Sequence, residues 1–96
     1  MAMFGKAREQ IEFVKKAREI QKKLQHEIFT IESGAVTIVI NGEQKLQKVV
    51  LNKEDVDADR LDVLEKDIKT AVESGIKKAQ EFAANLMKDI GGFPGM

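Results

Sequence analysis

Residues 35–42 read Ala-Val-Thr-Ile-Val-Ile-Asn-Gly, and this stretch decides the fold class. β-Branched residues dominate it up to Ile40, which favours a strand. Asn41-Gly42 follows at once and predicts a hairpin turn of type I′, in which both central residues need positive φ. The chain then returns in a second strand at about 45–51. Because the first strand is apolar on both of its faces, we expect both faces to be covered.

Upstream, β-branched residues at 28–32 precede a turn at Glu32-Ser33-Gly34. Segment 28–32 is either a further strand or the last turn of the preceding helix. Before it, apolar residues recur every three or four positions, which is the period of one helix face. These residues are Phe13, Ala17, Ile20, Leu24, Ile28 and Ile31. The residues between them are good helix formers, so we place the first helix at 6–27.

Downstream, the sequence predicts a second helix at residues 55–90. Acidic residues crowd its start, where the positive end of the helix dipole favours them. An apolar stripe follows, formed by Leu61, Leu64, Ile68, Val72, Gly75, Ala79, Ala83, Leu86 and Ile90. Gly75 indicates either a break near 74–75 or the close approach of another backbone. Gly91-Gly92 ends the helix, and we expect the tail at 91–96 to be mobile.

These elements predict one α+β domain over residues 1–96, with the order α-β-β-β-α and a small antiparallel meander between two long helices. Helices of this length reach beyond strands of five or six residues, so their apolar stripes need another surface. A domain of this size buries proportionally little surface alone, and we therefore predict a homodimer. The predicted interface consists of the apolar strand residues Val36, Ile38, Ile40, Val49 and Leu51.

Composition argues against several classes of function. The absence of cysteine excludes disulfides and thiolate metal sites, and a lone histidine, His26, cannot form a zinc site of two histidines within one chain. We interpret His26 as a surface residue. The glycines do not have the spacing of a phosphate-binding loop, and the alternating acids at 55–59 lack the glycine and distal Glu of a calcium loop. We predict no enzyme activity, cofactor, metal or small-molecule substrate.

Location also follows from the hydropathy of the sequence. No stretch approaches the roughly 20 apolar residues of a membrane span, and no apolar run near the N-terminus has the form of a secretory signal. We predict a cytoplasmic protein with no membrane partner.

The net charge hides an uneven distribution along the chain. The sequence has 16 basic and 16 acidic residues and a pI near 6.6, which argues against a wholly basic nucleic-acid binder. Residues 6–23, however, hold seven basic and three acidic residues, a net charge of +4. Residues 24–59 carry −4, and residues 60–96 are balanced. The net charge is therefore positive early in the chain, negative in its middle and zero in its last part.

The basic residues of the first helix are the candidate binding residues. They are Arg8, Lys15, Lys16, Arg18, Lys22 and Lys23. Several stand seven positions apart, so they recur on one side of the helix and could follow a nucleic-acid backbone, where each neutralised phosphate releases counterions. The alternative is a solvated face, because Glu12 and Glu19 can form i,i+4 pairs with their basic neighbours.

The ordered set of motifs resembles the YbaB/EbfC family of bacterial nucleoid-associated proteins over nearly the whole chain. The motifs are Met3-Phe4-Gly5-Lys6, the Lys/Gln-rich first helix, the turn Glu32-Ser33-Gly34, Val36-x-Ile38-x-Ile40-Asn41-Gly42, Val49-x-Leu51, Leu64-Glu65, Ile68-x-x-Ala71-Val72 and the tail Gly91-Gly92-Phe93-Pro94-Gly95. The sequence departs from the family pattern in two places. A single Gly34 stands where the family commonly has several glycines, and Glu73-Ser74-Gly75 replaces a frequent Asn-Asp-Ala.

The resemblance implies an α-β-β-β-α protomer, a tweezer-like homodimer and double-stranded DNA as the partner, with helical arms on the duplex. It also implies a nucleoid location and effects on nucleoid organisation and gene expression. We hypothesise contacts mainly to phosphates, which would give low sequence specificity.

Two other functions fit helices that flank a hairpin. One is a prefoldin-type chaperone or structural module that grips clients through apolar arm tips at Ile11, Val14 and Met87. The other is an adaptor that binds a protein through the acidic middle segment.

Overall fold

The computed structural model describes the backbone of residues 2–89 and the side chains of residues 8–89. Its elements follow the predicted order: helix α1 (Ala2–His26), strands β1 (Ile28–Ser33), β2 (Val36–Asn41) and β3 (Leu46–Leu51), and helix α2 (Leu61–Asp89). The fold is therefore α+β, and the segment at 28–32 is a strand rather than the end of a helix. The tail predicted at 91–96 lies outside the described residues.

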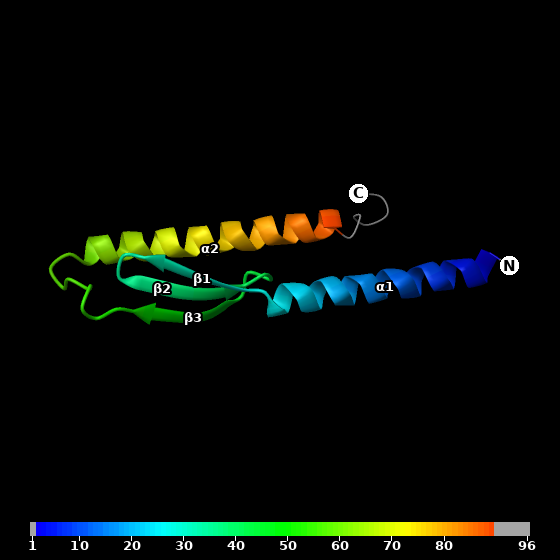
Figure 1. Cartoon of the computed structure of the whole chain (residues 1–96), viewed down its shortest axis with the longest axis horizontal. Helices are drawn as coiled ribbons and strands as arrows, with labels where there is room; N and C mark the ends of the chain where they lie inside the picture. The colour runs from blue at the N-terminus through cyan, green and yellow to red at the C-terminus, as the bar shows by residue number, and fades with distance from the viewer. Residues whose placement is uncertain (1, 90–96) are drawn as a thin grey trace.

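The three strands form one antiparallel sheet in the order β1-β2-β3, so β2 is central (Figure 1). The register places Ile38 of β2 opposite Ile31 of β1 and Val49 of β3. Directly opposite residues share a sheet face, and every second residue of each strand returns to that face. Between Val39 and Ile40 the register of the β2–β3 pair shifts by a bulge.

Helix α2 covers β1 and β2 and makes the core. Val36 and Ile38 are fully buried beneath it and Ile40 is 2% exposed, while Ala71 and Ala79 of the helix are also fully buried. A Cβ atom added to Gly75 would lie 3.0 Å from both Ile38 Cδ1 and Ile40 Cγ2. Isoleucine side chains of the sheet, and not another backbone, therefore approach Gly75 closely. Helix α2 is continuous through this point, so the alternative of a break near 74–75 is wrong.

This packing corrects part of the predicted dimer interface. Val36, Ile38 and Ile40 are buried by α2 of the same chain, so they are not free to meet a second copy. Val49 and Leu51 on the neighbouring strand stay 49% and 43% exposed. The difference arises because α2 packs over β1 and β2 and hardly reaches β3.

The β2–β3 connection differs from the predicted type I′ turn. Positive φ occurs at Gln44 (65°), and the connection runs through residues 42–45 between the strands. The side-chain oxygen Oδ1 of Asn41 accepts hydrogen bonds from the backbone N–H groups of Glu43 and Lys45, both at 3.0 Å. Asn41 thus organises a longer loop through its side chain.

The acidic stretch before α2 is not helical. Turns occupy much of residues 53–59, and the helix begins at Leu61. Asp57 Oδ1 accepts a hydrogen bond from the Asp59 N–H at 2.9 Å, and the Asp57 carbonyl accepts one from Arg60. Short acidic side chains that bond nearby backbone in this way compete with helix formation.

The molecule is elongated, with extents of 72 × 19 × 17 Å. Its radius of gyration is 19.3 Å, whereas a compact domain of this length would have about 12.5 Å. The cause is α1, which leaves the sheet at one end and projects away from it (Figure 1).

Candidate nucleic-acid interface

Among the described residues, helix α1 is buried mainly near its C-terminal end. Ile20 of its apolar stripe is buried and Leu24 is half-buried, but Phe13, two turns before Ile20, is 48% exposed. The stripe predicted from the sequence therefore runs beyond the surface available to cover it. We call residues 2–19 the arm.

All six predicted basic residues are exposed on this helix. At about 100° per residue, four of them fall within an arc of about 80° on the side of α1 opposite the apolar stripe. We call this set the basic face; its members are Arg8, Lys15, Arg18 and Lys22. From Arg8 to Lys22 it extends along the helix axis for about 21 Å.

The other two cations, Lys16 and Lys23, lie on a neighbouring strip together with Glu12 and Glu19. Among the described side chains, ion pairs within 4.0 Å join Arg60 with Asp62 and Lys69 with Glu73, and none is on α1. The i,i+4 pairs expected on α1 are not closed at this distance. The cations of the basic face are therefore available to an external anion.

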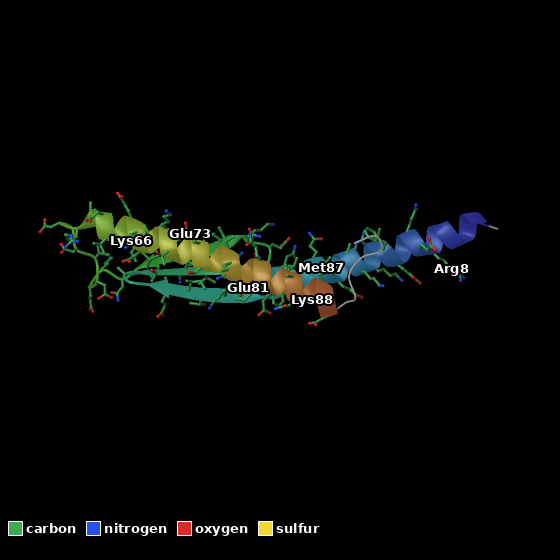
Figure 2. All side chains as sticks on the ribbon, turned by 90° about the horizontal axis from the view of Figure 1, so that it is seen from above. Arg8, Lys66, Glu73, Glu81, Met87 and Lys88 are labelled. Atoms are coloured by element: carbon green, nitrogen blue, oxygen red, sulfur yellow. The ribbon has the colours of Figure 1, made fainter. Side chains whose placement is uncertain are left out.

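A cluster of acidic residues lies at the other end of the molecule. The acidic loop between β3 and α2, residues 52–60, lies at the end of the long axis opposite the N-terminus (Figure 1). Between the two ends, Lys66, Glu73, Glu81 and Lys88 follow the outer side of α2 with mixed signs, whereas Arg8 lies far out on the arm (Figure 2). The acidic loop is thus far from the arm, while Glu27 and Glu43, which belong to the same negative segment of the sequence, stand at the junction of α1 with the sheet.

A second exposed feature is apolar and lies on β3. Leu46, Val49 and Leu51 are 50%, 49% and 43% exposed, and the register places them opposite Ile40, Ile38 and Val36, on the core face of the sheet. Leu61 and Ile68 on the sheet-facing stripe of α2 are also exposed, at 53% and 38%. These five residues form what we call the open core face.

A hollow of about 230 Å³ lies between the acidic loop and α2, and its polar lining consists of Asp55, Asp57, Arg60 and Asp67. Within residues 8–89 no group of three or more His, Cys, Asp or Glu side chains is arranged to hold a metal ion. His26, the last residue of α1, is exposed. No helix in the described part of the chain is long and apolar enough to span a membrane.

Sequence reasoning missed one residue of this region, Asn41. It is 4% exposed and donates through Nδ2 to the Gln25 carbonyl of α1 at 3.4 Å. The Asn-Gly pair predicts a local turn equally well, so no signal in the sequence shows that the side chain also reaches a helix.

The family model described as the YbaB/EbfC DNA-binding family matches residues 1–93 of this chain. The chain belongs to this family. The resemblance inferred from the ordered motifs is therefore confirmed, despite the single Gly34 and the Glu73-Ser74-Gly75 departure.

Several relatives in the family carry the name nucleoid-associated protein. One from Caldanaerobacter subterraneus is 36% identical over 95 residues, covering 86% of each chain. Another from Clostridium kluyveri is 30% identical over 89 residues, covering 88% of this chain and 78% of the relative. The crystal structure of an uncharacterized protein from Helicobacter pylori matches with a TM-score of 0.76 over 96% of this chain and 97% of that one. Its sequence identity is 19%, so it supports the fold alone.

Proposed function

We propose that this protein binds double-stranded DNA as a homodimer, with the basic faces of two α1 helices on the phosphate backbones. The observation that carries the proposal is the basic face: four exposed cations, unpaired among the described side chains, on a helix that projects from the body. Membership of a DNA-binding family and the names of the relatives support the same partner. The cellular role is organisation of the nucleoid, with effects on gene expression.

Phosphate contacts explain how a chain of zero net charge binds DNA. Counterion release depends on the cations that reach the backbone and not on the net charge of the protein. Two basic faces would neutralise up to about eight phosphates, so the logarithm of the binding constant would fall with the logarithm of salt at a slope near −7. Because the proposed contacts leave the base edges unread, sequence specificity is low.

Charge reversal on two strips of the same helix tests the assignment. Lys15→Glu/Lys22→Glu alters the basic face, and Lys16→Glu/Lys23→Glu makes the same change in net charge on the neighbouring strip. Titration of a fluorescent duplex at several salt concentrations should show that the first variant loses at least about 100-fold in affinity and that its salt slope is shallower by about 3 to 4. The second variant should lose much less.

Two outcomes contradict the proposal at different levels. Equal losses in the two variants would show that the basic face is not the contact surface. A wild-type protein that leaves the duplex unbound even at low salt would exclude DNA as the partner.

The open core face supports the homodimer. Its five apolar side chains continue the core of the chain, yet the described part of the chain leaves them 38–53% exposed. A second copy that presents the same face would bury these side chains in an isologous interface, to which each residue of the face would contribute once from each copy.

Substitutions at Val49 and Val50 provide a matched test of the proposed dimer interface. They are adjacent, 49% and 40% exposed, and point to opposite faces of the sheet. We expect light scattering to give twice the chain mass of 10.7 kDa for the wild type, and the mass of one chain for Val49→Asp. Val50→Asp should remain a dimer. A monomeric wild type, or dissociation by Val50→Asp alone, would contradict the assignment.

A second candidate function, client holding by the arms, is favoured by one observation. Ile11 and Val14 are 55% and 46% exposed on the arm, although Met87 of the predicted tip is half-buried. Suppression of the aggregation of a denatured model protein by the wild type, lost in Ile11→Ser/Val14→Ser, would support this function. Lack of suppression would exclude it.

A further inference from the structure

We infer that Asn41, with the loop it organises, is the positioning element that fixes the direction of the α1 arm. The inference goes beyond the proposed function, because it concerns how the arm is held and not what it binds. It rests on hydrogen bonds, burial and close contacts at the junction between α1 and the sheet.

The Asn41 side chain joins two structures. Its Oδ1 accepts from the N–H groups of Glu43 and Lys45, which closes the β2–β3 loop, while its Nδ2 donates to the carbonyl of Gln25. Gln25 is the penultimate residue of α1, so its carbonyl is one of the four that lack a partner within the helix. One buried side chain therefore holds the loop in shape and ties it to the helix end.

The backbone on either side of Asn41 strengthens the junction. The Gly42 N–H donates to the Glu27 carbonyl at 3.0 Å, immediately after the helix. Gly42 is buried, and a Cβ atom there would lie 2.7 Å from the Leu24 carbonyl oxygen. Glycine is required here by the nearness of α1, since Gly42 does not have positive φ.

The junction is important because a small change in the angle of α1 there displaces the far part of the arm by several ångströms. Sixteen helical steps beyond Gln25 bring the chain to Glu9, about 24 Å away along the axis. A tilt of about 10° would displace this part of the arm by about 4 Å, more than the rise of one base pair, about 3.4 Å. Simultaneous contact of both arms with a duplex therefore needs a fixed arm direction.

Asn41→Asp separates the two tasks of the side chain. Aspartate keeps the acceptors for the loop N–H groups but loses the donor to Gln25, and it adds a negative charge beside the negative end of the helix dipole. Asn52→Asp is the matched control. Asn52 Oδ1 accepts from the Glu54 N–H at 3.2 Å and its Nδ2 donates to Asp55 Oδ2 at 2.7 Å, so aspartate there also keeps a local acceptor and loses a donor, but neither bond reaches α1.

The experiment measures arm direction by pulsed electron–electron spin resonance. Since the chain has no cysteine, spin labels at Gln10→Cys on the arm and Gln80→Cys on α2 report this direction specifically. Dilution with unlabelled protein removes distances between copies. We expect a narrow distance distribution in the wild type and in Asn52→Asp, and a broadened or displaced one in Asn41→Asp. Circular dichroism checks that each variant is folded, and Asn41→Ser replaces Asn41→Asp if the latter does not fold.

DNA titration of the same proteins adds a functional readout. With every cation of the basic face in place, Asn41→Asp should bind duplex DNA about tenfold more weakly or worse, because the two arms no longer engage together. An unchanged distance distribution in a folded Asn41 variant would overturn the inference. A wild type that does not bind DNA would overturn the proposed function instead, and the spin-label result would still decide the role of Asn41.

Discussion

Helices α1 and α2 have the same apolar periodicity but different environments. On α2 the stripe residues Gly75 and Ala79, and the adjacent Ala71, are buried on the side that faces β1 and β2. On α1 the stripe is buried at Ile20 and exposed at Phe13. Periodicity therefore identifies an apolar helix face. Whether that face is buried depends on which part of the fold lies opposite it. Small residues on α2 allow the sheet to pack closely against it, whereas, in the part of the chain that the structure describes, no strand of the sheet packs against the arm.

The largest expected effect comes from emptying the core under α2. Ile38→Ala removes a fully buried side chain at the centre of the sheet and should lower the free energy of unfolding by about 3 kcal/mol. Ile11→Ala, the matched change on the arm, should alter it by about 0.5 kcal/mol or less, because Ile11 is 55% exposed. Urea denaturation followed by circular dichroism measures both. A comparable loss from Ile11→Ala would mean that the arm is covered in solution.

A smaller effect tests the close approach of α2 to the sheet. Alanine at Gly75 would gain about 1 kcal/mol of helix propensity but would place its Cβ 3.0 Å from two isoleucine methyl groups. We expect a net loss of about 1 kcal/mol by the same denaturation assay. Ser74→Ala, one position round the helix, is the control and should have almost no effect. A stabilised Gly75→Ala protein would show that the contact has room to spare.

The smallest effect concerns the charges of the two helices. Lys69→Met breaks an exposed pair with Glu73 at 3.9 Å on α2 and should cost about 0.3 kcal/mol. Lys15→Met on the arm should leave the melting temperature unchanged, since no carboxylate among the described side chains lies within 4.0 Å, yet it should weaken DNA binding. A clear loss of stability from Lys15→Met would show that this lysine has a structural role.

Local sequence signals predict most of the fold. The β-branched run ending at Ile40, the hairpin return and the two apolar stripes are sufficient for the order α-β-β-β-α. They are not sufficient to say what buries Val36, Ile38 and Ile40, because an apolar strand is the same in sequence whether its own helix or a second copy covers it. That distinction is a tertiary one.

At the junctions between elements, contacts with neighbouring parts of the fold override the local sequence preferences. Asn41-Gly42 has the sequence of a two-residue turn. It forms part of a longer loop, which packs closely against the backbone of Leu24 in α1. The acids before α2 favour a helix start, but the turn at Asp57 delays it to Leu61. For the candidate site, helical geometry and the sequence suffice to group four of the cations. The spacing of Glu12 and Glu19 does not reveal that their i,i+4 pairs remain open.

The division of charge along the 72 Å axis has a consequence for the path to DNA. A body that is positive at one end and negative at the other experiences a torque in the field of a polyanion, and it rotates as it diffuses. We therefore expect collisions with a duplex to occur with the arm foremost and encounters with the loop foremost to be repelled. In the proposed complex the acidic loops would point away from the duplex, and we expect neighbouring coated duplexes to repel one another instead of precipitating together.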